Sequence, residues 1–213
     1  MTDHLEAINR EQAFSESDPF TEGRYRQFAR HLVPGFTGHV LDVGCNTGRG
    51  GRAFLAGAPG AVLDGVELLA DRIARIPPGI YREVHEGTQE AVPDSSPYDV
   101  LLMGELIEHV PLAVIDELLA DAWRLLAPGG RLLLTTPNPH YVLLRRRSGG
   151  TVLGGAHVSV HCPVALSQYL AWKGFTVETV TGSGRVSGVV GGRLPLALYG
   201  SYLLAAVKPG TSR

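Results

Sequence analysis

Short apolar runs and helix-like stripes follow one another along most of this chain. The apolar runs predict strands at residues 40–43, 61–66, 81–85, 98–103 and 131–136. Helical spacing is clearest after Pro111, where apolar residues recur with a period of about 3.6 as far as Leu126. Because strands and helices alternate with short connections, the pattern predicts an α/β fold: a doubly wound, mostly parallel sheet in three αβα layers.

The same pattern extends toward both ends of the chain. A helix is expected between Asp18-Pro19 and Pro34-Gly35, and further helices are expected at 49–57, 71–76 and 163–173. The last two apolar runs, Phe175–Thr181 and Leu198–Val207, predict an antiparallel hairpin around a glycine-rich loop. This hairpin brings the expected sheet to seven strands.

Domain boundaries are placed where the periodic pattern changes. Residues 1–18 are polar and are expected to be mobile, so we assign 1–35 to an N-terminal helical segment or lid and 36–213 to one domain. Residues 138–163 show no clear period and carry two glycine pairs. A connection of that length is uncommon without a function, so we expect it to form a loop or lid over the site.

Composition limits the choice of partner. The 213 residues are 44% hydrophobic and 19% charged, as in a globular protein, and the formal net charge is −2. This balance disfavours nucleic acid or an anionic membrane as a partner, and the triple arginine at 145–147 is interpreted as a solvated loop. Two cysteines make no disulfide framework, and we find neither a signal segment nor a membrane span, so a cytoplasmic protein is expected.

The first strand ends in a glycine-rich turn. Residues Val40–Gly50 read VLDVGCNTGRG, in which Gly44 and Gly48 bracket the turn and a helix follows. Glycines let a ligand approach the backbone, and the free N–H groups of a helix start suit a carboxylate or phosphate. Since open α/β sheets bind ligands outside the carboxyl ends of their strands, we expect the ligand here.

Polar residues at the next two strand ends indicate which class of ligand binds here. Glu67 ends the second strand, about 20 residues past the turn, where a carboxylate can accept both hydroxyls of a ribose. Thr88 and Gln89 follow the third strand and can meet an adenine edge. Together these features predict a nucleoside-containing ligand. The glycine spacing fits neither the dinucleotide fingerprint nor a phosphate loop, which disfavours a nicotinamide-dependent oxidoreductase.

Four stretches resemble one known family. They are LDVGCNTG at 41–48, YDVLLMGELIEHV at 98–110, LLAPGGRLLLTTPNP at 125–139 and HVSVHCPVALSQYLAWKGF at 157–175. They are similar to motifs of class I S-adenosylmethionine-dependent methyltransferases, and the last resembles the branch with ubiquinone-biosynthesis O-methyltransferases. The resemblance implies a Rossmann-like sheet and S-adenosylmethionine as cofactor. Asn46 stands where a glycine is common, and asparagine tolerates the left-handed backbone well.

The resemblance also implies roles for particular residues on the cofactor side. Those expected to hold the cofactor are Asp42, Gly44, Cys45, Asn46, Gly48, Glu67, Leu68, Thr88, Gln89, Gly104 and Glu105. The turn would hold the methionine moiety, Glu67 the ribose and Leu68 the adenine, while Gly104 and Glu105 would lie beside the sulfonium methyl.

The acceptor side of the site is expected after the fourth strand. Methyl transfer aligns nucleophile, methyl and sulfur, and often requires removal of a proton. Glu105, Glu108 and His109 have the i, i+3, i+4 spacing that faces one way on a helical turn, and His157 lies on the suspected lid. We interpret His109, His157 and Glu108 as catalytic candidates, with His109 or His157 as general base. The alternative for His109 is a structural histidine that bonds the backbone.

A divalent metal ion is a second hypothesis for the same residues. Glu105, Glu108, His109 and His157 supply two carboxylates and two imidazoles, a plausible ligand set, and resemble the metal site of small-RNA 3′-end methyltransferases. Because similar Leu-Ile-Glu-His-Val segments occur in metal-free relatives, a metal-free site is preferred at this point.

The sequence therefore predicts an S-adenosylmethionine-dependent methyltransferase that acts on a small molecule, at an oxygen. A nitrogen or carbon acceptor and a non-catalytic nucleoside-binding protein are the alternatives. The acceptor, the role of residues 182–200 and the choice between monomer and homodimer stay open. Arg24 and Tyr25, on the first predicted helix, could both reach the ligand site.

Overall fold

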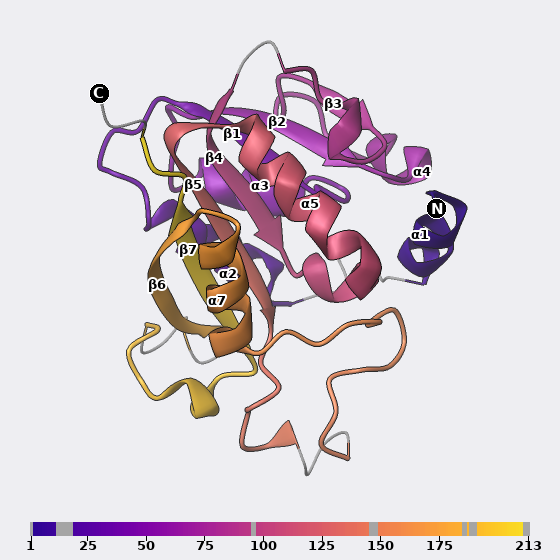
Figure 1. Ribbon diagram of the computed structural model, residues 1–213. Coiled ribbons are helices and arrows are strands. Elements are labelled where there is room, and N and C mark those ends of the chain that lie inside the picture. The colour runs from indigo at the N-terminus through magenta and orange to yellow at the C-terminus, as the bar shows by residue number, and fades with distance from the viewer. Residues whose placement is uncertain are drawn as a thin grey trace.

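The computed structural model describes residues 2–11, 19–94, 97–144, 149–184, 187 and 191–210. Seven strands form one sheet in the order β3-β2-β1-β4-β5-β7-β6 (Figure 1). They are β1 His39–Val43, β2 Val62–Glu67, β3 Val84–Glu86, β4 Tyr98–Gly104, β5 Leu126–Pro137, β6 Thr176–Ser183 and β7 Ser201–Val207. The first five pair in parallel, whereas β7 runs antiparallel to both β5 and β6. The predicted sheet and its C-terminal hairpin are confirmed.

Helices cover both faces of this sheet. They are α1 Thr2–Arg10, α2 Thr21–Ala29, α3 Arg49–Leu55, α4 Ala70–Ile73, α5 Leu112–Leu125 and α7 Pro163–Trp172, with 3₁₀ turns η2 Gln89–Ala91, η3 Ile107–His109 and η4 Leu196–Leu198. Successive strand residues face opposite sides. Leu41 therefore joins the core under α5 and α7, while Val40 packs with Phe28 of α2 and Phe54 of α3. This is the expected αβα arrangement.

The N-terminal segment contains a helix that the sequence did not place. Within residues expected to be mobile, Thr2–Arg10 form α1, and Leu5 and Ile8 are buried. Their i, i+3 spacing gives the helix one apolar face, and the Arg72 guanidinium donates a 2.6 Å hydrogen bond to the Asn9 carbonyl. A short amphipathic face and one anchor thus dock a segment that composition alone made look unstructured.

Smaller differences concern element boundaries. The helix expected from Asp18-Pro19 begins at Thr21, and Asp18 lies outside the described residues. The sequence predicted a helix as far as Leu126 and a strand from residue 131, with Pro128-Gly129-Gly130 between them. Instead, α5 passes directly into β5, and the pairing of β4 with β5 shifts there from Leu126 to Arg131. Gly129 has a φ of 83°, so the turn is absorbed as an irregularity inside the strand.

Residues 138–163 connect β5 to α7 by a path outside the three layers (Figure 1). In the described part of this connection, the regular pairing is a bridge between Gly154 and His157. The N–H groups of Val158 and Ser159 both donate to the Glu108 carbonyl, at 2.8 and 3.1 Å. These bonds fix the end of the connection against the turn that follows β4. The predicted triple-arginine loop at 145–147 lies outside the described residues.

Sheet order places a crevice at the end of β1. The chain leaves β1 toward β2 on one side, and β4 lies on the other, so the direction of winding reverses between β1 and β4. The glycine turn, Glu67 and the segment after Gly104 all emerge at this edge. Among the described helices, none is long and apolar enough to cross a membrane.

Candidate active site

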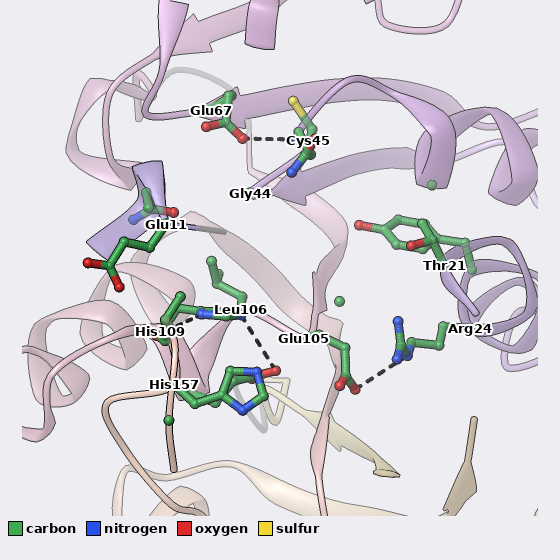
Figure 2. Close-up of a pocket in the computed structure, with 18 residues that line it drawn as sticks. Glu11, Thr21, Arg24, Gly44, Cys45, Glu67, Glu105, Leu106, His109 and His157 are labelled. Atoms are coloured by element: carbon green, nitrogen blue, oxygen red, sulfur yellow. Dashed lines mark hydrogen bonds and ion pairs between the residues drawn. The ribbon is translucent and has the colours of Figure 1, made fainter. Parts of the chain in front are cut away.

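Two adjoining cavities open at the carboxyl ends of β1, β2 and β4. The main cavity, of about 420 Å³, is lined by Asn9, Glu11, Thr21, Arg24, Tyr25, Gly44, Cys45, Asn46, Gly50, Glu67, Gly104, Glu105, Leu106, Glu108, His109, Gly154, Ala156 and His157 (Figure 2). The side cavity, of about 110 Å³, includes Leu68, Thr88 and Gln89. Gly44, Glu67 and Leu106 line both, so the two form one continuous site.

Most residues predicted from the sequence meet at these cavities, but two do not. Gly48 lines a separate cavity together with Arg49 and Arg52. Asp42 is fully buried and lines neither part of the site. The sequence did not single out Asn9, Glu11, Thr21 or Leu106, and only their position in the fold brings them here.

The glycine turn has the backbone that its sequence required. Gly44, Asn46 and Gly48 have φ values of 75°, 50° and 80°. The N–H groups of Gly44 and Cys45 donate to the Val66 carbonyl at 2.8 and 3.0 Å, which holds the turn against β2. Asn46 thus occupies the left-handed region in place of a glycine, as expected from its short polar side chain.

Glu67 is held at the border between the two cavities. Its Oε2 accepts a 2.9 Å hydrogen bond from the Asn46 N–H, and its Oε1 accepts a 3.0 Å bond from the Leu69 N–H. Burial raises the pKa of Glu67, and the Leu69 N–H, the Arg72 guanidinium 3.8 Å away and the Asn46 N–H oppose that rise. A carboxylate oxygen has further lone pairs, so both oxygens can still accept ligand hydroxyls.

Asp42 acts on the site through two tyrosines. The Tyr25 hydroxyl donates to Oδ1 at 2.6 Å and the Tyr81 hydroxyl to Oδ2 at 2.7 Å. Burial raises the pKa of Asp42 to about 6, against the two hydrogen bonds. We expected Asp42 to hold the methionine moiety directly. The structure instead places its carboxylate behind the cavity wall, and the buried Tyr25 is the member of the pair that lines the cavity.

The residues after β4 form the floor of the main cavity. Glu105 has a φ of 53°, and its N–H donates to the Thr135 carbonyl at 3.0 Å. Its carboxylate accepts from the Ser201 hydroxyl at 3.2 Å and lies 3.4 Å from the Arg24 guanidinium (Figure 2). Arg24, a helix residue that the sequence left open, therefore both makes an ion pair and lines the cavity.

Glu108, His109 and His157 gather on the opposite wall. The His109 and His157 rings meet edge to face with centroids 4.8 Å apart. Nδ1 of His109 lies 2.9 Å from the Ala156 carbonyl, and Nδ1 of His157 lies 2.9 Å from the Val152 carbonyl. A carbonyl only accepts, so Nδ1 carries a proton in both rings, and Nε2 is the nitrogen of each that can offer a lone pair to a ligand.

Burial sets the charge of this cluster. It lowers the pKa of His109 to about 4 and raises the pKa of Glu108 well above its usual range, with nearby Glu105 adding to the rise. Glu108 Oε2 accepts from the Thr136 hydroxyl at 3.0 Å. Oε1 is 3.9 Å from His109 Nε2 and, among the residues described, has no hydrogen-bond partner.

Of the four metal ligands considered from the sequence, the structure brings three together. They are Glu108, His109 and His157, and one ligand atom of each lies within 4.8 Å of the other two. Glu105 is turned away toward Arg24 and Ser201 instead. The predicted i, i+3, i+4 face is therefore split, because η3 is a 3₁₀ turn and Glu105 precedes it with a left-handed backbone.

Comparison with known proteins places the chain in a family. The profile described as methyltransferase domain matches residues 18–180. The chain belongs to this family of S-adenosylmethionine-dependent class I methyltransferases, so the predicted enzyme class and cofactor are confirmed. No curated protein matched the sequence.

Solved structures share the fold at low sequence identity. A SAM-dependent methyltransferase from Archaeoglobus fulgidus is 18% identical with a TM-score of 0.65, over 88% of this chain and 94% of that one. The glycopeptide N-methyltransferase MtfA, complexed with S-adenosylmethionine, is 20% identical with a TM-score of 0.65, over 93% and 98%. The mitomycin 7-O-methyltransferase MmcR is 14% identical with a TM-score of 0.67, but this chain covers only 54% of it and 88% of its own length.

Proposed function

We propose that this methyltransferase transfers the methyl group of S-adenosylmethionine to a hydroxyl oxygen of a small molecule. The observation that carries the proposal is the arrangement of the main cavity. Its glycine-turn side is suited to the donor, and Glu108, His109 and His157 face it from the other side. Of the two solved structures named for their acceptors, one is a glycopeptide N-methyltransferase and the other a mitomycin 7-O-methyltransferase.

The donor is assigned along the edge of β1 and β2. Glu67 offers two carboxylate oxygens to the ribose hydroxyls. The side cavity, with Leu68, Thr88 and Gln89, takes the adenine. Gly44, Cys45 and Asn46 then contact the methionine end, with Tyr25 in the role first expected of Asp42.

The methyl group is assigned to the floor beside Gly104 and Glu105. A Cβ on Gly104 would lie 2.8 Å from the Tyr25 ring, so the absence of a side chain lets the ring approach the cavity floor. The Glu105 carboxylate supplies negative charge near the sulfonium, balanced in part by Arg24. Four carboxylates and one guanidinium line the cavity, which favours a cationic donor.

The acceptor is assigned between this floor and residues 154–157. A hydroxyl becomes a good nucleophile only when its proton is withdrawn. His109 is neutral at pH 7, and its Nε2 lone pair is free to accept that proton because Nδ1–H is already bonded to Ala156. A neutral amine needs no such base before attack, so this cluster favours oxygen over nitrogen.

The test is turnover with a deuterium-labelled methyl donor and a panel of small phenols, alcohols and amines. Mass spectrometry should find the labelled methyl on oxygen, with S-adenosylhomocysteine formed in equal amount. His109→Ala should lower turnover by about 10²–10⁴-fold while leaving donor binding intact. Labelled amines with unmodified hydroxyls would contradict the oxygen assignment. Full activity in His109→Ala would remove His109 from the chemistry.

A further inference from the structure

We propose that Glu108, His109 and His157 bind one divalent transition-metal ion on the wall of the main cavity. The ligand atoms are Oε1 of Glu108 and Nε2 of each histidine. The inference rests on the proposed function for its role, because the ion would bind and activate the acceptor hydroxyl. Binding of the ion itself can be measured without any methyl transfer.

The three ligand atoms already lie close together. One atom from each residue falls within 4.8 Å of the others, and Glu108 Oε1 is 3.9 Å from His109 Nε2. Two residues come from η3 after β4, and the third comes from the connection held against η3 by hydrogen bonds to the Glu108 carbonyl. Small side-chain shifts bring such atoms to the ~2.0–2.2 Å bonds that divalent zinc forms with imidazole and carboxylate.

Backbone carbonyls orient both imidazoles for this purpose. A metal-bound histidine typically donates its other ring N–H to a carbonyl or carboxylate, which fixes the tautomer and the ring. Nδ1 of His109 does so to Ala156 and Nδ1 of His157 to Val152, each over 2.9 Å. Both contacts come from the same connection, and the two imidazole rings lie side by side (Figure 2).

The Glu108 carboxylate gives an independent indication of a bound cation. Glu108 is 2% exposed, and Thr136 satisfies only its Oε2. Within the described part of the chain, Oε1 has no hydrogen-bond partner and lies 3.9 Å from Nε2 of His109. A buried polar oxygen without a partner is costly, and a cation bound between these two atoms would satisfy both of them.

The ligand types favour a first-row transition ion. Imidazoles suit Zn²⁺, Fe²⁺, Co²⁺ and Ni²⁺, whereas Mg²⁺ and Ca²⁺ prefer oxygen ligands. Two histidines and one carboxylate leave positions open toward the cavity, where an acceptor oxygen can bind. The bound hydroxyl would release its proton to water. Its oxygen would then form the new O–C bond as the C–S bond breaks and the electron pair goes to sulfur.

With the ion bound, His109 is a ligand and not the proton acceptor. Glu108 and His157, which the sequence suggested as catalytic residues, are then metal ligands as well. The two accounts therefore differ in one measurable respect, since only the metal account predicts that chelation abolishes turnover.

The test is titration of chelator-treated protein with Co²⁺, followed by visible absorption and calorimetry. Wild type should bind one ion per chain and show the d–d bands of a coordinated ion. His109→Ala, His157→Ala and Glu108→Gln should each bind at least about 100-fold more weakly, since loss of even an outer-shell partner typically costs ~10–100-fold. His140→Ala, an exposed histidine on the same connection, is the matched control and should bind as wild type.

Thermal unfolding shows whether each variant is folded, so that weak Co²⁺ binding is not mistaken for misfolding. Co²⁺ should raise the Tm of wild type and His140→Ala, but not that of His157→Ala, whose side chain is only half-buried. Equal Co²⁺ affinity in all variants, or no binding by wild type, would overturn the metal site. Undiminished turnover after chelation would do the same and leave the methyltransferase function intact. Metal binding without turnover would instead count against the proposed acceptor.

Discussion

The hydroxyl of Tyr25 donates a hydrogen bond to Oδ1 of Asp42 over 2.6 Å, which ties α2 to the end of β1. The Tyr25 ring also packs so closely on Gly50 and Gly104 that a Cβ at either would lie under 3 Å from it. One side chain thus joins α2, the glycine turn and the cavity floor. The main cavity depends on this contact for its shape.

Tyr25→Phe should lower the free energy of unfolding by about 1–3 kcal/mol, because one oxygen of a buried carboxylate loses its donor. Urea unfolding followed by circular dichroism measures this. Tyr81→Phe removes the other donor and should behave alike. Tyr169→Phe, whose hydroxyl bonds Asp116 at the surface, is the control and should change stability by less than about 1 kcal/mol. Equal effects from all three substitutions would refute the special role of Asp42.

Asp42 should also make stability depend on pH. Its pKa is about 6 in the folded protein and 3.8 as the ordinary value. Between those two values the folded state binds more protons than the unfolded state, so stability falls as pH rises. The loss is complete above about pH 6 and is on the order of 3 kcal/mol.

Asp42→Asn removes this titration. The difference in unfolding free energy between wild type and Asp42→Asn should therefore shift in favour of the variant from pH 4 to pH 7. Urea unfolding at several pH values measures the difference. Curves that stay parallel across this range would show that Asp42 does not titrate in it.

Gln89 should separate stability from cofactor binding. It is 4% exposed, and its Nε2 has no hydrogen-bond partner among the described residues. Gln89→Met should leave the cofactor-free protein equally stable or up to about 1 kcal/mol more stable, yet weaken S-adenosylmethionine binding about 10-fold, because the adenine loses a donor. Unfolding and calorimetry measure the two effects.

Gln27 is the matched control for that experiment. It is equally buried, but its amide bonds the Gly182 carbonyl and the Ser183 hydroxyl, both at 2.9 Å. Gln27→Met should lose stability and keep its cofactor affinity. The reverse pattern in the two variants would contradict the placement of adenine at Gln89.

Much of the fold could be predicted because it follows from local patterns. The short apolar runs of the strands and the helical period of α5 required no tertiary information. The left-handed backbone at Asn46 could also be predicted, since the turn needs it and the residue tolerates it. Docking of α1 could not, because it depends on Arg72, which is distant in sequence.

Some features of the site could likewise be predicted from the sequence, and others could not. Glu67 and Gln89 follow strands whose ends the topology brings together, so their meeting was predictable. The tyrosines that cover Asp42 come from α2 and from before β3, and no local spacing relates them to it. The carbonyls of Ala156 and Val152, which orient the two histidines, belong to a connection without periodicity. Composition could not place them, so from the sequence a metal site was only the second hypothesis for these residues.

The most direct test of the central claim is calorimetric titration of S-adenosylmethionine into wild type and Glu67→Ala. The claim is that the donor nucleoside lies against Glu67, whose oxygens are held by Asn46 and Leu69. Wild type should bind one cofactor per chain. Glu67→Ala should bind about 10–100-fold more weakly, from the loss of charge-assisted hydrogen bonds, and Glu83→Ala, an exposed carboxylate before β3, should bind as wild type. Equal affinity in wild type and Glu67→Ala would contradict the account.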